Sequence, residues 1–198
     1  MDYNWRITPM PVAQYSKLPS GNELTLNIVD YFFQLYPKGI KETVQAFCKK
    51  HEKHQYKVFH YVYDHTAIGK SPSGKSFCDI VIEAFRKEGW VVVEHYIGGA
   101  SDHDIKFENM KPWFLLRNND AVTMNENTCD QLIKAIEQTP AITTGGVTQK
   151  DKRSEKKMDF PPEDSTHGPD AFDTLLWGFY VENIRPGSST FSMPIKAG

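Results

Sequence analysis

The order of strand and helix patterns constrains this chain more than any other feature of its sequence. Residues 24–35 (LTLNIVDYFFQL) form a long strand pattern. Residues 5–15 form an earlier one that Pro9 and Pro11 interrupt, as is typical of a sheet edge or a bulge. After Pro37, helix and strand patterns alternate. Two strands followed by such an alternation predict an α/β fold with one mixed β-sheet flanked by helices on both faces.

The later elements follow from shorter periodic patterns. These patterns predict helices after Pro37, from Phe77 to Gly89, and over 103–116, 127–138 and 170–180, and strands over 57–63, 90–96 and 121–124. The strand over 90–96 (WVVVEHY) is nearly all apolar, which predicts a central position in the sheet. Residues 143–163 are polar and charged, which predicts an exposed, mobile loop or hairpin. We therefore expect one domain over residues 1–182 and a tail over 183–198.

Composition narrows the class of protein. A chain of 198 residues that is 39% hydrophobic is long enough for one domain with a real core. No apolar run approaches the roughly 20 residues that cross a bilayer, so no membrane association is expected. The net charge of -2 argues against a general nucleic-acid coat but allows a local basic patch. Cys48, Cys78 and Cys129 are odd in number and widely spaced, which predicts free thiols in a reducing cytosol.

Three aspartates stand where a site could form. Asp2 opens the first strand, Asp64 closes the strand over 57–63, and Asp170 begins the last helix. If the first and third strands lie side by side, Asp2 and Asp64 converge at one end of the sheet, and the last helix can bring Asp170 across it. Three such carboxylates would repel one another unless a divalent cation neutralised them, and Mg²⁺ or Mn²⁺ suits their oxygen ligands. Taken singly, each aspartate is better explained as a turn or cap residue.

The last helix has two faces. Its helical spacing places Phe172, Leu175, Leu176 and Phe179 on a core face, and Asp170, Asp173 and Trp177 on the opposite one. His167 precedes them. A large aromatic residue and a histidine beside two acids indicate a cleft, although a solvated face would show a similar pattern.

Three stretches of the sequence resemble the nuclease domain of the large terminase subunit of tailed phages and prophages. DYNWRITPMPVAQ resembles its first strand, and YVYDHTAIG resembles the strand that delivers its second acid. KDKRSEK followed by STHGPDAFDTLLWGF resembles its C-terminal signature, in which a histidine precedes by three residues the aspartate that opens the last helix. The order and spacing of these pieces cover about nine-tenths of the chain.

This resemblance implies a ribonuclease-H-like fold and a two-metal endonuclease that cuts double-stranded DNA during genome packaging. It implies Asp2, Asp64 and Asp170 as ligands of a pair of Mg²⁺ or Mn²⁺ ions, His167 as a catalytic helper, and Asp173 behind the ligands. The partners would be double-stranded DNA, the terminase ATPase domain, the small terminase subunit and the portal, in the cytoplasm of a bacterial host. A basic run would either follow the DNA backbone or form a solvated loop; it comprises Lys150, Lys152, Arg153, Lys156 and Lys157.

Residues 69–76 (GKSPSGKS) support a rival interpretation. They match the phosphate-binding pattern G-x-x-x-x-G-K-[ST] between a strand and a helix, which predicts an NTPase with Lys75 on the phosphates and Ser76 on Mg²⁺. Pro72 argues against it, because such a loop points successive amides at phosphate and proline has none. We therefore favour a flexible loop that caps the next helix through Ser76. A third alternative is a catalytically inert domain that docks the packaging motor.

Overall fold

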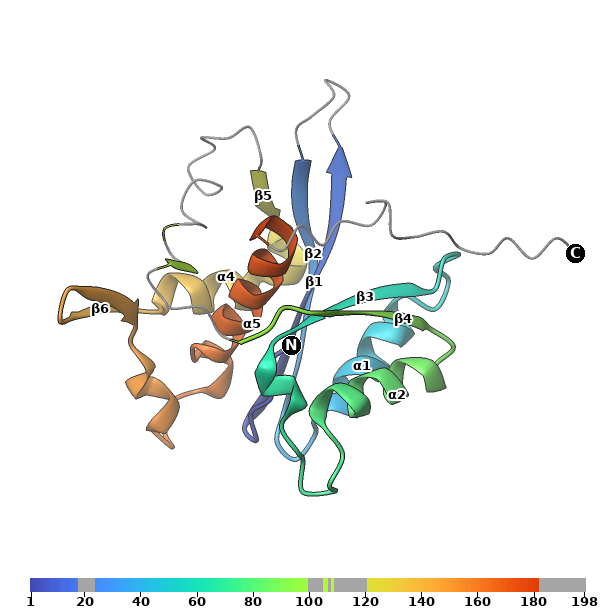
Figure 1. Cartoon of the computed structure of the whole chain (residues 1–198), viewed down its shortest axis with the longest axis horizontal. Helices are drawn as coiled ribbons and strands as arrows, with labels where there is room; N and C mark the ends of the chain where they lie inside the picture. Colours follow the sequence, from blue (N-terminus) through green and yellow to red (C-terminus); the bar gives the residue numbers. More distant parts are fainter. Residues whose placement is uncertain (18–23, 100–104, 107, 109–120, 182–198) are drawn as a thin grey trace, which may run out of the picture.

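The chain folds into a mixed α/β structure of helices and small sheets (Figure 1). The computed structural model describes residues 1–17, 24–99, 105–106, 108 and 121–181. The strands are β1 (Ile7–Lys17), β2 (Leu24–Leu35), β3 (Val58–Tyr63), β4 (Val91–Tyr96), β5 (Ala121–Met124), β6 (Ala141–Thr144) and β7 (Val147–Lys150). The α-helices are α1 (Ile40–Lys50), α2 (Phe77–Lys87), α4 (Glu126–Gln138) and α5 (His167–Leu176), which continues as the π-helix η4 (Trp177–Val181). The 3-10 segments are η1 (His65–Ile68), η2 (Lys152–Lys156) and η3 (Pro162–Asp164).

The strands of the described residues form three sheets rather than the single sheet expected from the sequence. β1 pairs antiparallel with β2, which pairs parallel with β5. β3 pairs parallel with β4, and β6 forms an antiparallel hairpin with β7. Although β1 and β3 are close enough for Met10 and Tyr61 to line a common cavity of about 30 Å³, they are not hydrogen-bonded neighbours.

The two prolines of β1 explain this division. The carbonyl oxygen of Pro9 accepts a hydrogen bond from the Asp2 amide at 3.3 Å, so it points away from β2. In an antiparallel strand the nitrogen of a residue points to the same side as its carbonyl oxygen. The residue two positions further along points its nitrogen and oxygen to that side again. The nitrogens of Pro9 and Pro11 therefore lie on this outer edge, where they offer no hydrogen for a further strand.

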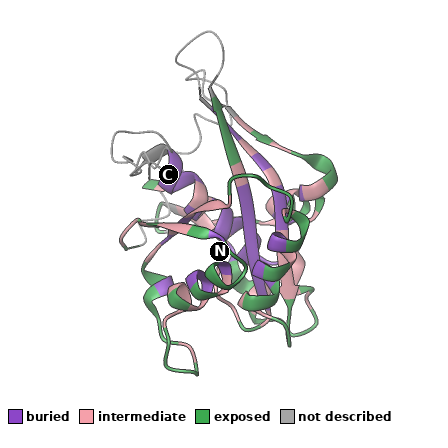
Figure 2. Cartoon of the chain, turned by 90° about the vertical axis from the view of Figure 1, so that its right-hand side faces the viewer, coloured by how far each residue is buried: buried purple, intermediate pink, exposed green. Residues whose placement is uncertain are grey.

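Helices cover the β1–β2 sheet on both faces, as the sequence predicted. On one face, Met10 and Val12 of β1 join residues of α1, α2 and β3 in a core cluster. On the other face, Leu26 and Ile28 of β2 join residues of α4 and α5 in a second cluster. Figure 2 shows the buried residues along these long central strands. The sheet thus separates two cores, and α5 is held over β1 by the second.

Most expected helices and strands are found. α4 follows the side-chain cap of Asn125, which accepts a hydrogen bond from the Asn127 amide at 3.1 Å. Ser76 caps α2 in the same way, through the Asp79 amide at 3.2 Å. The three cysteines are free thiols. No helix among the described residues has the length and apolar character that a membrane crossing requires. The predicted helix over 103–116 and the tail over 183–198 lie essentially outside the described residues.

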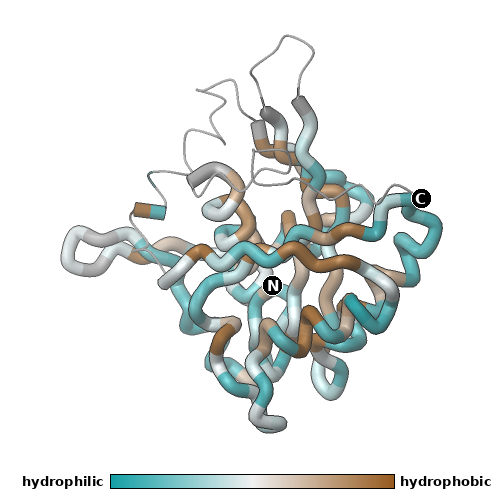
Figure 3. Tube along the Cα trace, turned by 45° about the vertical axis from the view of Figure 1, so that its right-hand side comes forward, coloured by the Kyte–Doolittle hydropathy of each residue, from teal (hydrophilic) through white to brown (hydrophobic). Residues whose placement is uncertain are grey.

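The prediction of a central position for β4 is wrong. Within the described part of the chain β4 has one hydrogen-bonded neighbour, β3, and Val91 and Tyr96 are 60% and 52% exposed. Figure 3 shows the hydrophobic segments that run through the paired strands β3 and β4. The apolar run of β4 packs only in part against the first core cluster, through Val92 and the preceding Trp90. A continuous apolar pattern therefore indicated strand structure correctly but overestimated burial.

A histidine pair on β3 and β4 is expected to make the stability of the fold depend on pH. Nδ1 of His60 lies 2.9 Å from Nε2 of His95, and their rings stack with centroids 5.1 Å apart. Burial lowers the pKa of both imidazoles, and the charge of His60 lowers that of His95 further. Each histidine therefore binds fewer protons when the protein is folded than when it is unfolded, so stability should fall as the pH falls from about 6.5 through the folded-state pKa values.

His95→Gln is expected to make the melting temperature less sensitive to pH between about pH 7 and pH 5, because one of these protonation sites is removed. Circular dichroism melts across this range provide the measurement. His54→Gln is the matched control, since His54 is exposed. Equal slopes for wild type and His95→Gln would show that the pair does not control acid stability.

Candidate active site

Four aspartates from three separate parts of the chain line one pocket of about 180 Å³. They are Asp2, Asp64, Asp170 and Asp173, and the pocket is also lined by Lys106 and Lys152. The N-terminal segment supplies the first, the end of β3 the second, and α5 the other two. Figure 1 shows the N-terminus close to α5 and to the segment that follows β3. The three acids predicted from the sequence are therefore brought together.

Asp2 reaches the pocket by a different route from the one predicted. It does not open the first strand, because β1 begins at Ile7. The chain before β1 instead folds back along the proline edge, where the Asp2 amide donates to Pro9. One carboxylate oxygen of Asp2 accepts from the Tyr3 amide at 2.8 Å, and the other lies 2.6 Å from Nδ1 of His167. Asp2 is thus a fixed part of the pocket wall.

Asp64 is positioned by the local turn after β3. It is the N-cap of η1, and its Oδ1 accepts hydrogen bonds from the Thr66 amide at 2.9 Å and from the Thr66 hydroxyl at 2.6 Å. Asp64 is therefore both a cap residue and part of the pocket lining. A capping aspartate points its charge in a defined direction, because the first helical turn fixes its side chain.

Asp170 and Asp173 lie one turn apart on α5 and share a lysine. Nζ of Lys150 is 3.0 Å from Asp170 Oδ1 and 2.5 Å from Asp173 Oδ2. Nζ of Lys152 is 2.5 Å from Asp170 Oδ2. Burial disfavours the charged form of Asp170, but the two lysines outweigh it and lower its pKa. For Asp173 burial prevails over Lys150 and raises the pKa. The pKa values of the two carboxyl groups thus shift in opposite directions although both contact Lys150.

His167 begins α5, one turn earlier than the sequence suggested. It is buried, and burial opposes its protonation, but its hydrogen bond to Asp2 and the charge of that carboxylate raise its pKa. The next residue must be small: a Cβ added to Gly168 would lie 2.6 Å from the hydroxyl oxygen of Tyr31. Tyr31 on β2 therefore packs directly against this turn, two residues before Asp170.

Three of the five residues of the basic run make ion pairs within the protein. Residues 143–163 contain the turn of the β6–β7 hairpin, β7, η2 and the start of η3. Lys150 and Lys152 pair with the pocket acids, and Arg153 pairs with the buried Asp151. Lys156 and Lys157 are exposed. That the run contacts DNA stays a prediction.

Arg6 fastens this segment to the start of β1. Its guanidinium donates to the carbonyl oxygens of Glu155, Lys157, Met158 and Phe160, at distances of 2.9–3.4 Å. One arginine thereby satisfies four backbone acceptors of an irregular segment, which orders it without regular secondary structure. The sequence held no local signal for this contact, because Arg6 and its acceptors are about 150 residues apart.

The pocket acids have the donor chemistry of a magnesium or manganese site but not yet its arrangement. Carboxylate oxygens are the hard ligands that both ions prefer. In residues 1–17, 24–99, 105–106, 108 and 121–181, however, no group of three or more His, Cys, Asp or Glu side chains is placed to hold a metal ion. Both oxygens of Asp170 are in lysine ion pairs, and Asp2 is held by Tyr3 and His167. A metal ion at Asp170 would therefore compete with these lysines.

The core face of α5 is close to its prediction. Phe172, Leu176 and Phe179 are buried, and Leu175 is half-buried. The opposite face differs, because Trp177 is buried at 8% exposure and does not stand open beside the acids. Lys106 and Tyr31 were not expected from the sequence, since neither stands in a recognisable motif.

The segment over 69–76 uses its own polar groups internally. The amides of Ser71 and Gly74 donate to Lys75 and Ser71 carbonyl oxygens at 2.8 and 2.9 Å. Nζ of Lys75 lies 2.6 Å from a carboxylate oxygen of Glu83 on α2. A phosphate-binding loop must keep its amides and its lysine available to the nucleotide. The contacts of this loop therefore favour the capping interpretation.

Comparisons with models of protein families, with curated proteins and with solved structures gave no match to this chain.

Proposed function

We propose that this chain is a metal-dependent endonuclease domain that cuts double-stranded DNA, with the ribonuclease-H-like arrangement of large terminase nuclease domains. One observation carries the proposal: Asp2, Asp64, Asp170 and Asp173 meet in a single pocket although they come from distant parts of the chain. Acids gathered at one point repel one another, so such a cluster is costly unless cations hold it together. Two long strands, helices on both faces and an acid-bearing final helix also agree with this fold.

The side chains of the pocket have distinct roles in the proposal. Asp64 and Asp170 hold the cation, and Asp2 completes the set. His167 fixes the direction of the Asp2 carboxylate through its 2.6 Å contact. Lys106, on the pocket wall, attracts the DNA phosphate. The bound Mg²⁺ or Mn²⁺ ions supply the Lewis acidity and the activated water that phosphodiester hydrolysis requires.

The biological setting is part of the same proposal. Double-stranded DNA is the substrate, and the ATPase domain, the small terminase subunit and the portal are the partners, in the cytoplasm of a bacterial host. Low sequence preference is expected, because the proposed contacts are to phosphate, and phosphate contacts carry no sequence information directly.

Incubation of the purified chain with supercoiled plasmid tests the activity. We expect nicked and then linear DNA with Mg²⁺ or Mn²⁺, no cutting after EDTA is added, and no effect of ATP. Asp130→Asn is the matched control for preparation artefacts, because Asp130 is an exposed acid on α4, away from the pocket. If the DNA stays intact with both metals while Mn²⁺ binds normally, the chain is better described as an inert docking domain.

A further inference from the structure

The two lysines that neutralise the pocket acids are held very differently. The Lys150 side chain is 20% exposed and bridges Asp170 and Asp173. The Lys152 side chain is 44% exposed and contacts Asp170 through one oxygen, Oδ2. Lys152 lines the pocket itself, whereas Lys150 is absent from its lining. The Lys150 ammonium group thus lies against two acids of α5, whereas the Lys152 side chain lines the space that a ligand would enter.

We propose that Lys152 is an exchangeable cation of this site: it occupies the Asp170 oxygen that a divalent metal takes, and it passes to a substrate phosphate when the metal binds. Lys150 stays in place and positions Asp170. This inference rests on the proposed nuclease function, which it deepens by assigning a substrate-contacting residue.

Electrostatics favours the exchange. The pocket gathers four acids, and the Lys152 ammonium group, 2.5 Å from Asp170 Oδ2, repels a metal ion that approaches this oxygen. Lys152 has the more exposed side chain of the two lysines, and it contacts one pocket acid, Asp170, besides a 4.0 Å contact with Glu155, so it is cheaper to displace. Displacement of Lys150 would remove the counter-charge of two acids at once, including the more buried Asp173.

The backbone around Lys152 is anchored, so the exchange needs only a side-chain movement. On one side Asp151 is buried and accepts a hydrogen bond from the Arg153 amide at 3.0 Å. On the other, Arg6 holds the carbonyls of residues 155–160. A flexible lysine stem on such a support can reach either the carboxylate or a phosphate beside it, and its compact ammonium group suits both.

Mn²⁺ binding without DNA tests this role independently of catalysis. In the purified full chain, Lys152→Met should bind Mn²⁺ about 10-fold more tightly than wild type by electron paramagnetic resonance titration, because the competing cation is gone. Lys156→Met is the matched control and should leave the Mn²⁺ affinity unchanged, since Lys156 is exposed on the same segment. Lys150→Met should instead weaken Mn²⁺ binding, because Asp170 loses its positioning contact.

DNA binding in the presence of Ca²⁺ supplies the second arm. Lys152→Met should reduce the slope of log affinity against log salt by about 0.9, the value of one lost phosphate contact. Unchanged or weaker Mn²⁺ binding by Lys152→Met, beside a wild type that binds Mn²⁺, would overturn the exchange and leave the nuclease proposal standing. Absence of Mn²⁺ binding in wild type and in all three variants would overturn both.

Discussion

Asp64→Asn and Asp170→Asn are each expected to lower the rate of metal-dependent plasmid cutting by about 100-fold or more, because each removes a charged ligand from the proposed cation site. The exposed-acid variant Asp130→Asn should cut at the wild-type rate. Initial rates of nicking at saturating Mn²⁺ provide the measurement. A wild-type rate for either pocket variant would exclude that aspartate from the site.

The same two variants should differ in stability. Asp64→Asn keeps a side-chain oxygen that can accept from the Thr66 amide, so its free energy of unfolding should change by less than about 0.5 kcal/mol. Asp170→Asn leaves Lys150 and Lys152 facing a neutral amide and should lower the free energy of unfolding by about 1–3 kcal/mol. Relief of the repulsion among the pocket acids would act in the opposite direction. Urea unfolding distinguishes these expectations, and a more stable Asp170→Asn variant would show that repulsion prevails.

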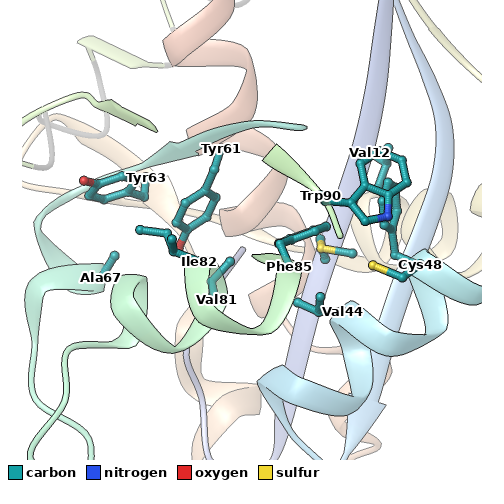
Figure 4. Packing of buried hydrophobic residues seen from close by; sticks show 12 residues of the cluster. Val12, Val44, Cys48, Tyr61, Tyr63, Ala67, Val81, Ile82, Phe85 and Trp90 are labelled. Atoms are coloured by element: carbon teal, nitrogen blue, oxygen red, sulfur yellow. The ribbon is translucent and has the colours of Figure 1, made fainter. Parts of the chain in front are cut away.

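Phe85→Ala is expected to destabilise the fold by about 3–5 kcal/mol, the largest stability loss that we predict. Phe85 is fully buried on α2, and its ring stacks on Phe59 with centroids 4.3 Å apart. It also contacts the rings of Phe47 and Trp90. Figure 4 shows Phe85 and Trp90 in the core between the helices and the strands. Removal of this ring leaves a cavity among rigid aromatic neighbours, which cannot easily close it.

Urea unfolding followed by tryptophan fluorescence measures this loss, since Trp90 reports on the same cluster. Tyr56→Ala is the matched control: it also removes an aromatic ring, but Tyr56 is 76% exposed, so a change within about 0.5 kcal/mol is expected. A loss below about 1 kcal/mol for Phe85→Ala would mean that the first core tolerates a cavity.

Local periodicity was sufficient for most helices and strands but not for the sheet. β2 was predicted at its observed bounds, because its apolar residues and its turn signal lie within a few residues of one another. β4 was recognised as a strand, but its predicted central place was wrong, since burial depends on which elements cover it. Pro9 and Pro11 were correctly taken as signs of an edge. Their consequence, the separation of β1 from β3, became clear only from the position of Asp2.

The sequence by itself determined which acids to consider, the two-faced character of α5 and the capping role of Ser76, because these depend on residue type and on spacings of a few residues. Only the tertiary structure decided how the acids are neutralised. Asp170 is paired with lysines 18 and 20 residues away, and Asp2 with a histidine 165 residues away. Such contacts form only when distant parts of the chain come together and α5 packs against β1, and no local pattern encodes them. Residue type therefore indicated which acids to consider, and the fold determined which lysines and which histidine lie against them.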